Sequence, residues 1–144
     1  MEFTKPSTFL AFDYGTKSIG IAVGQTVTKT AKMLTAIQSK GEQPNWKSIG
    51  EVVREWQPQV LVVGLPLNMD GTEQPLTQKA RKFIEELRSR FNLPVDSEDE
   101  RLTTVEARAK LFEQGGFRSL SKANIDSLSA QLILESWMKR NIHQ

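Results

Sequence analysis

Short apolar blocks along the first 40 residues predict β-strands. Phe9–Phe12 and Ile19–Val23 are apolar runs, and the polar, glycine-containing segment Asp13–Ser18 joins them. Two apolar runs with such a connection are typical of a β-hairpin. Thr30–Ile37 is predicted as a third strand, which the Gly-Glu-Gln-Pro segment at 41–44 ends. The chain is therefore predicted to begin with a three-stranded meander.

The middle of the chain alternates between helical and extended patterns. Apolar residues recur at helical spacing over residues 46–56, with Asn45 as a suitable N-cap and Pro58 as a stop. Gln59–Gly64, QVLVVG, is almost entirely apolar, as expected for a strand buried on both faces of a sheet. The loop LPLNMDGTEQP follows, and then a basic amphipathic helix over Leu76–Phe91.

The last third of the chain predicts one more strand and two helices. The strand covers Val95–Arg101, and Thr103–Glu106 matches the capping box of a helix that runs to residue 114. A polar, basic connector over Phe117–Ala123 leads to the final helix. That helix is predicted to start at Ser121 or Asn124 and to end near residue 140.

This order of elements predicts an α/β domain. A meander followed by β-α-β-α-β crossovers builds a five-stranded mixed sheet, with three antiparallel and two parallel strands and helices on both faces. The length of 144 residues corresponds to a single domain over 1–144, with residues 1–7 as a flexible N-terminus.

The composition restricts the chemistry that the chain can perform. It contains no cysteine, and His143 is its only histidine. Thiolate metal sites and cysteine nucleophiles are excluded, and a serine–histidine triad or a multi-histidine zinc site is disfavoured. Acid–base or metal chemistry must therefore rest on carboxylates and lysines. No signal peptide or bilayer-spanning run is evident, so we expect a cytoplasmic protein with no membrane partner, and its net charge of +2 permits a polyanionic one.

Carboxylates stand at three places where an α/β sheet gathers functional groups. Asp13 ends the first predicted strand, Asp99 and Glu100 end the last one, and Asp126 lies in the first turn of the last helix. Each also has an ordinary structural interpretation. Asp13 can be a turn residue, one acid of the Asp99–Glu100 pair can be a partner of Arg101, and Asp126 can be a first-turn acid that interacts favourably with the helix dipole. If the fold brings them together, their mutual repulsion favours a bound cation, and Mg²⁺ or Mn²⁺ prefers such oxygen ligands. Two such ions can activate a water and stabilise the leaving oxygen in phosphodiester hydrolysis.

Four segments together resemble a known family. FDYGTKSIGIAVG, VVGLPLNMDGTEQP, DERLTTVEA and the final DSLSAQLILE are similar, in this order, to the YqgF/RuvX family of the ribonuclease H-like superfamily over essentially residues 8–138. The resemblance implies a ribonuclease H-like fold and a hydrolase that cleaves phosphodiester bonds with divalent metal ions. The implied function is nuclease processing of the 5′ end of precursor 16S rRNA in ribosome biogenesis. A Holliday junction resolvase acting in DNA recombination and repair is the alternative.

The resemblance also implies a ligand set. Asp13 corresponds to the first-strand metal ligand and Asp126 to the ligand on the C-terminal helix, and an acid of the Asp-Glu-Arg segment is the remaining one. We prefer Glu100, with Asp99 as the alternative, so that Asp13, Glu100 and Asp126 are the expected metal-binding and catalytic residues. Related resolvases carry an acid on the strand that here reads QVLVVG and continues into LPLN. The Asp-Glu-Arg segment is a candidate replacement for it.

Polar residues beside these motifs are expected to bind nucleic acid. Lys17 follows the Asp13 turn, where it can contact a phosphate. Asn68 and Thr72 lie in the loop beyond a strand end, where they bind either the substrate or the loop itself. Arg101 and Arg108 adjoin the acidic motif. The other basic residues of the helix over 76–91 are more typical of an ordinary solvated face.

Two other functions fit parts of the sequence. A non-catalytic RNA-binding factor for ribosome assembly would keep the fold without using the acids. An ATPase of the actin and sugar-kinase kind shares the Asp-x-Gly-Thr turn, but it needs two such domains, and 144 residues are too few. The expected partners are precursor rRNA first, branched DNA as the alternative, and ribosomal particles, for a protein that is a monomer or a weak dimer.

Overall fold

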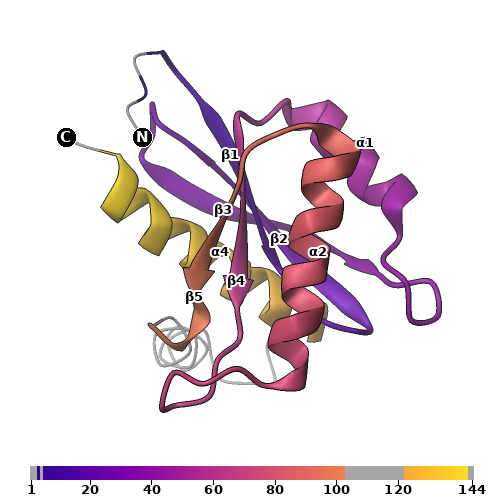
Figure 1. The fold of residues 1–144 in the computed structure, drawn as a ribbon. Helices are drawn as coiled ribbons and strands as arrows, with labels where there is room; N and C mark the ends of the chain where they lie inside the picture. The colour runs from indigo at the N-terminus through magenta and orange to yellow at the C-terminus, as the bar shows by residue number, and fades with distance from the viewer. Residues whose placement is uncertain (1–2, 4, 103–121, 143–144) are drawn as a thin grey trace.

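The computed structural model describes residues 3, 5–102 and 122–142, and only the backbone of residues 102 and 122–126. Figure 1 shows its elements in chain order. They are β1 (Thr8–Asp13), β2 (Ser18–Gln25), β3 (Thr30–Gln38), α1 (Trp46–Trp56), β4 (Val60–Leu65), α2 (Pro75–Phe91), β5 (Val95–Asp99), the short 3-10 helix η1 (Glu100–Leu102) and α4 (Lys122–Asn141).

One sheet with the strand order β3-β2-β1-β4-β5 forms the centre of the fold. β2 pairs antiparallel with both β1 and β3, whereas β4 pairs parallel with both β1 and β5. The predicted mixed sheet, a three-stranded antiparallel meander extended by two parallel strands, is therefore confirmed.

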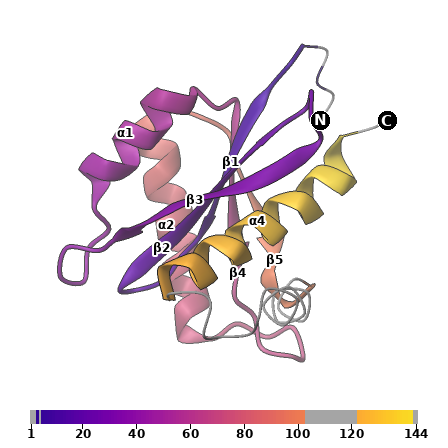
Figure 2. The same cartoon turned by 180° about the vertical axis from the view of Figure 1, so that it is seen from behind.

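Helices cover both faces of the sheet, α1 and α2 on one and α4 on the other (Figures 1 and 2). Side chains alternate between the faces along each strand, and β1 shows this division. Leu10 and Phe12 belong to an apolar cluster with residues of α1 and α2. Phe9 and Ala11 belong to a second cluster with residues of α4. Every residue of β4 is buried, as predicted for a strand covered on both faces.

Most predicted element boundaries agree with the structure to within one or two residues. Asn45 caps α1, and its side-chain oxygen accepts a hydrogen bond from the amide of Ser48 at 3.3 Å. The three tryptophans contribute to packing: Trp137 is fully buried, and the partly buried Trp46 and Trp56 pack against the core under α1.

One boundary differs clearly from the prediction. The strand predicted over Val95–Arg101 ends at Asp99, because the Asp99 carboxylate accepts a hydrogen bond from the amide of Arg101 at 3.0 Å and so turns the chain. α4 begins at Lys122, between the two predicted starts at Ser121 and Asn124, so residues 122 and 123 of the predicted connector are helical. The helix predicted from Thr103, its glycine stop and residues 117–121 of the connector lie outside the described residues.

Partly buried polar contacts, as well as apolar packing, hold α4 against β5. The Trp137 Nε1–H donates to Asp96 Oδ2 at 2.8 Å, and the Trp137 ring lies edge-on to Phe9 with 5.0 Å between centroids. Glu98 is only 2% exposed, accepts a hydrogen bond from Ser136 Oγ at 2.5 Å and pairs with Arg140. Because buried charges need such partners, these contacts determine how α4 lies on the sheet. Among the described residues, no helix is long and apolar enough to cross a membrane.

Candidate active site

The carboxyl ends of three neighbouring strands form one edge of the sheet. β1 ends at Asp13, β4 at Leu65 and β5 at Asp99. The parallel pairing sets Phe12 opposite Val63 and Leu65 opposite Asp99. The first two acidic segments predicted from the sequence therefore meet at this edge, which is where α/β proteins place their sites.

Asp13 and Glu100 are both on the face of the sheet that α4 covers. Asp13 has the same parity along β1 as Phe9 and Ala11, which pack against α4. The carboxyl carbon of Glu100 lies 3.6 Å from the position that a Cβ on Gly64 would occupy. Both acids are half-buried.

The glycine at position 64 is explained by the close approach of α4. A Cβ on Gly64 would stand 2.5 Å from Cδ1 of Ile133, which is fully buried. Because a packed core gives way only at a cost, β4 has no room for a side chain here. Glu100, which follows the neighbouring strand, lies above this glycine.

Ser127 holds the beginning of α4 against β2. Its hydroxyl accepts a hydrogen bond from the amide of Ile21 at 3.3 Å, at the point where the pairing of β2 with β3 is irregular. Gly20, the preceding residue, is paired with Asp13. The backbone of Asp126 therefore lies near the end of β1, although its side chain is outside the described part of the chain. Sequence reasoning missed Ser127, and the only signal was its place beside Asp126 in the DSLSA motif.

Asp99 has different partners from Glu100. Its carboxylate accepts hydrogen bonds from Arg101 Nε at 3.0 Å and Nη2 at 2.6 Å. The bonds from the Arg101 side chain hold the pKa of Asp99 below its usual range, against a smaller opposing effect of burial. Among the side chains that the structure describes, no three acids are grouped closely enough to hold a metal ion. The set of Asp13, Glu100 and Asp126 involves a side chain beyond that description.

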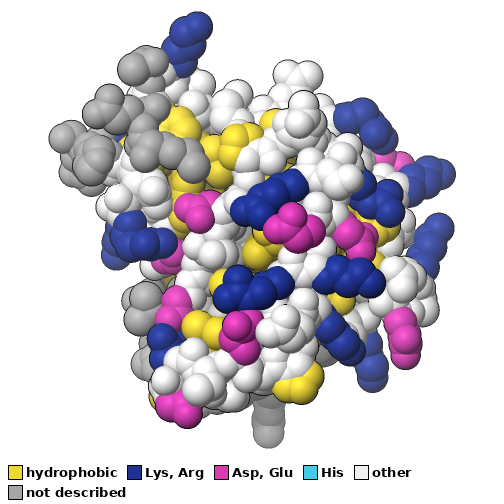
Figure 3. All heavy atoms as spheres, in the orientation of Figure 1, with side chains coloured by type: hydrophobic (Ala, Val, Ile, Leu, Met, Phe, Trp, Pro, Cys, Tyr) yellow, Lys and Arg dark blue, Asp and Glu magenta, His cyan; other side chains and the backbone are white. Residues whose placement is uncertain are grey.

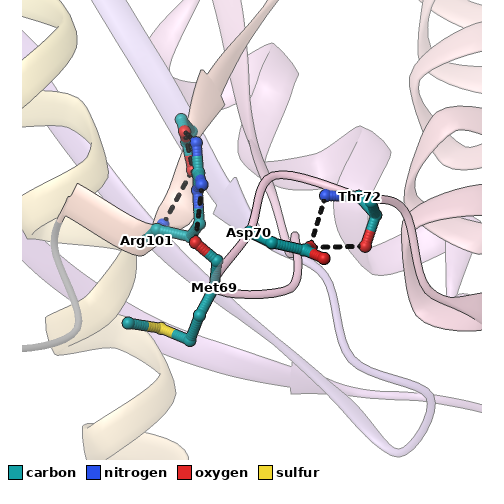
Figure 4. A network of polar contacts seen from close by, with 5 residues as sticks. Met69, Asp70, Thr72 and Arg101 are labelled. Atoms are coloured by element: carbon teal, nitrogen blue, oxygen red, sulfur yellow. Dashed lines mark hydrogen bonds and ion pairs between the residues drawn. The ribbon is translucent and has the colours of Figure 1, made fainter.

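The loop between β4 and α2 is closed by hydrogen bonds of its own polar residues (Figure 4). The amide and hydroxyl of Thr72 donate to the Asp70 carboxylate at 3.0 and 2.6 Å, and these bonds lower the pKa of Asp70. Asn68 Nδ2 donates to Thr72 Oγ1 at 3.0 Å. Asn68 and Thr72 are thus used in loop closure, and their binding of nucleic acid stays a prediction.

Arg101 joins this loop to the end of β5 (Figure 4). Besides its bonds to Asp99, its Nη1 donates to the carbonyl of Met69 at 3.1 Å. Gly71 has a φ of +89°, which a glycine adopts readily, and a Cβ there would lie 3.4 Å from Nη1 of Arg101. The guanidinium therefore has a structural task, and its contact with nucleic acid remains a prediction.

A cavity of about 350 Å³ lies beside the β1–β2 hairpin. Its lining includes Asp13, Lys17 and Leu76, the last from the first turn of α2. Lys17 is exposed, so its ammonium group can reach a ligand beside Asp13. Arg108 lies outside the described residues.

Comparison with known proteins decides to which family this arrangement belongs. The family described as "RuvX: Holliday junction resolvase" matches residues 7–140. The chain belongs to the RuvX family.

Curated relatives of this RuvX-family protein are similar over nearly their whole length. A protein from Haemophilus ducreyi is 61% identical over 135 residues, which are 94% of this chain and 98% of the relative. One from Yersinia pestis is 57% identical over 130 residues, with coverage of 90% and 93%. Both carry the name "Putative pre-16S rRNA nuclease".

Solved structures share the fold at low sequence identity. Thermus thermophilus RuvC in complex with a Holliday junction superposes with a TM-score of 0.55 at 15% identity, covering 93% of this chain and 95% of RuvC. The fowlpox virus Holliday junction resolvase gives 0.57 at 15% identity, with 92% and 98% covered. The predicted ribonuclease H-like fold is therefore confirmed as that of RuvC-like resolvases.

In this RuvX-family protein, Arg101→Met is expected to loosen the loop over residues 66–74 without unfolding the domain. The variant loses the charged pair with Asp99 and the bond to Met69, so amides of residues 68–73 should exchange about 10-fold faster or more in hydrogen-exchange mass spectrometry. Arg54→Met, on the exposed side of α1, is the control and should leave these amides unchanged.

The same contact predicts a pH dependence of the loop. Because the pKa of Asp99 is lowered, its stabilising effect is complete at neutral pH and is lost as the pH falls below the usual aspartate range. Exchange of wild-type loop amides, corrected for intrinsic rates, should therefore rise on acidification. Equal acid sensitivity in Arg101→Met would contradict this role of Arg101.

Proposed function

We propose that this protein is a metal-dependent endonuclease that processes the 5′ end of precursor 16S rRNA. The observation that supports the proposal is that Asp13, Glu100 and the start of α4 lie at one edge of the sheet. Curated relatives named as pre-16S rRNA nucleases, at about 60% identity over most of the chain, support the choice of substrate. The lack of cysteine suits a reducing compartment, and we place the activity in the cytoplasm.

Asp13, Glu100 and Asp126 would hold the metal in this proposal. Carboxylate oxygens suit Mg²⁺ and Mn²⁺, and the chain offers no thiolate and one histidine near its C-terminus. Glu100 is preferred to Asp99 because the Asp99 carboxylate is engaged by Arg101. When bound, the metal would activate water and stabilise the leaving oxygen, and two ions in the site would share these tasks.

The residues around these acids would bind and orient the RNA. Lys17 is our main candidate for a phosphate contact, because it is exposed and lines the same cavity as Asp13. Asn68 and Thr72 are exposed in a loop that Arg101 holds in place, so this loop would present their remaining hydrogen-bonding capacity to the strand. Arg108 keeps its proposed phosphate contact on sequence grounds alone.

Holliday junction resolution is the second candidate, because the family description and the fold-sharing structures name it. Cutting a junction symmetrically requires two active sites, so a resolvase should act as a dimer on DNA. We instead expect a monomer or weak dimer that acts on precursor rRNA, either free or within ribosomal particles.

Incubation of the full chain with two labelled substrates tests the proposal. An RNA that spans the 5′ end of mature 16S rRNA should be cut with Mg²⁺ or Mn²⁺ and left intact in EDTA. A four-way DNA junction should not be cut at paired positions. Paired cuts in the junction with intact RNA would favour the resolvase. Binding of the RNA without cleavage under any metal would favour a non-catalytic assembly factor.

A further inference from the structure

A second pocket also borders the β1–β2 hairpin turn. It has a volume of about 430 Å³, within the roughly 300–1,000 Å³ typical of ligand sites. Residues of the hairpin, of the segment after β3 and of one side of α2 line it. We call it the Lys79–Lys82 pocket, after the two α2 lysines in its wall.

The cations of α2 divide into two groups. Each arginine forms an ion pair with a nearby glutamate. The N–O distances are 2.7, 2.5 and 3.9 Å for Arg81–Glu73, Arg88–Glu85 and Arg90–Glu86. Lys79 and Lys82, and Lys17 across the pocket, form no ion pair with any residue that the structure describes. Figure 3 shows the basic face that carries α2, with acids among the cations.

The charge balance of the pocket favours an anion. Three lysines line it against two glutamates, Glu42 and Glu86, and Glu86 is also the partner of Arg90. Lysine ammonium groups bind phosphates as point charges and do not need a fixed geometry. The pocket is therefore suited to phosphate groups of a flexible chain.

An aromatic row supports the wall of the pocket. The Tyr14 ring lies 5.1 Å from Phe83, and Phe83 stacks on Trp46 at 5.4 Å between centroids. Tyr14 is half-buried and lines the pocket, so it ends this row where a planar ligand can reach it.

The Lys79–Lys82 pocket adjoins the cavity beside Asp13. Tyr14, Thr16 and Lys17 line both. A nucleotide chain with a phosphate beside Asp13 can therefore extend past the hairpin turn into the neighbouring pocket.

We propose that the Lys79–Lys82 pocket binds a single-stranded nucleotide segment next to the phosphate held at Asp13. Lys79 and Lys82 contact its phosphates, and Tyr14 stacks with one of its bases. This inference rests on the proposed nuclease function and adds the place where the strand lies outside the cleavage centre.

Binding of labelled oligouridylate to the full chain in EDTA tests this pocket without requiring cleavage. The Lys79→Gln/Lys82→Gln variant should bind about 10-fold more weakly, and its plot of log affinity against log salt should be shallower by about 1.4, or 0.7 for each phosphate contact. The matched control is Lys5→Gln/Lys139→Gln, which removes the same charge from exposed positions near the chain termini. It should keep the wild-type slope.

Tyrosine variants test the base contact separately. Tyr14→Leu should weaken binding by about 5-fold to 150-fold, whereas Tyr14→Phe, which keeps the ring, should stay near wild type. The proposed nucleotide site would be contradicted if the double lysine variant kept the wild-type affinity and salt slope. It would also be contradicted if the wild type did not bind oligouridylate. If binding follows the lysines but precursor rRNA is never cut, the nuclease proposal fails and the pocket remains.

Discussion

Asp13→Asn is expected to lower the rate of RNA cleavage at saturating Mg²⁺ by at least ~100-fold, because loss of the proposed direct metal ligand should exceed the 10- to 100-fold effects typical of changes in residues that only support a ligand. Asp13 ends β1 inside a hydrogen-bonded strand pair, so asparagine keeps the shape of the site and removes the charge. Single-turnover cleavage of the precursor RNA, repeated over a range of Mg²⁺ concentrations, measures the effect. The variant should also need more Mg²⁺ to reach its lower maximum.

Two further variants make this result specific. Glu100→Gln should resemble Asp13→Asn, since Glu100 lies above Gly64 at the same edge. Asp99→Asn should keep substantially more activity, since the Asp99 carboxylate is hydrogen-bonded to Arg101. Thermal melts should show that all three variants are folded. Full activity of Asp13→Asn would remove the proposed active site, and the reverse order of Glu100→Gln and Asp99→Asn would make Asp99 the ligand.

Among the variants named here, Trp137→Ala should be the most destabilising, and it should lower the free energy of unfolding by about 3–5 kcal/mol. Trp137 is fully buried between α4 and the sheet, lies edge-on to Phe9 and donates to Asp96. The substitution leaves a cavity and also an acceptor without its donor. Urea unfolding followed by circular dichroism measures the change, with an unchanged denaturant slope as evidence that the comparison is valid.

Trp137→Phe separates the two parts of this loss. It keeps most of the apolar ring and removes the Nε1–H, so it should cost about 1–3 kcal/mol. A loss below about 1 kcal/mol for Trp137→Ala would show that α4 contributes little to the core. Because α4 also carries Asp126, a proposed metal ligand, both variants should raise the Mg²⁺ concentration needed for half-maximal cleavage more than a surface change such as Lys139→Gln.

The fold was largely predictable because its signals are local. The apolar runs of β1 and β2, the doubly buried β4 and the Asn45 cap of α1 each follow from residues a few positions apart. The end of β5 was not predictable in this way. The Asp99 carboxylate accepts a hydrogen bond from the backbone amide of Arg101, and this bond competes with continued strand pairing. The spacing of apolar residues does not reveal such a hydrogen bond.

The site was predictable as a list of acids and not as an arrangement. The sequence alone determined that carboxylates are the available metal ligands and that Asp13, Asp99, Glu100 and Asp126 are the candidates. Only the tertiary structure set Glu100 above Gly64, engaged Asp99 with Arg101 and joined α4 to β2 through Ser127. It also set the α2 lysines across from Lys17 in one pocket. These relations are between segments far apart in the chain, and they depend on how closely helices pack on the sheet, which no local pattern of apolar and polar residues encodes.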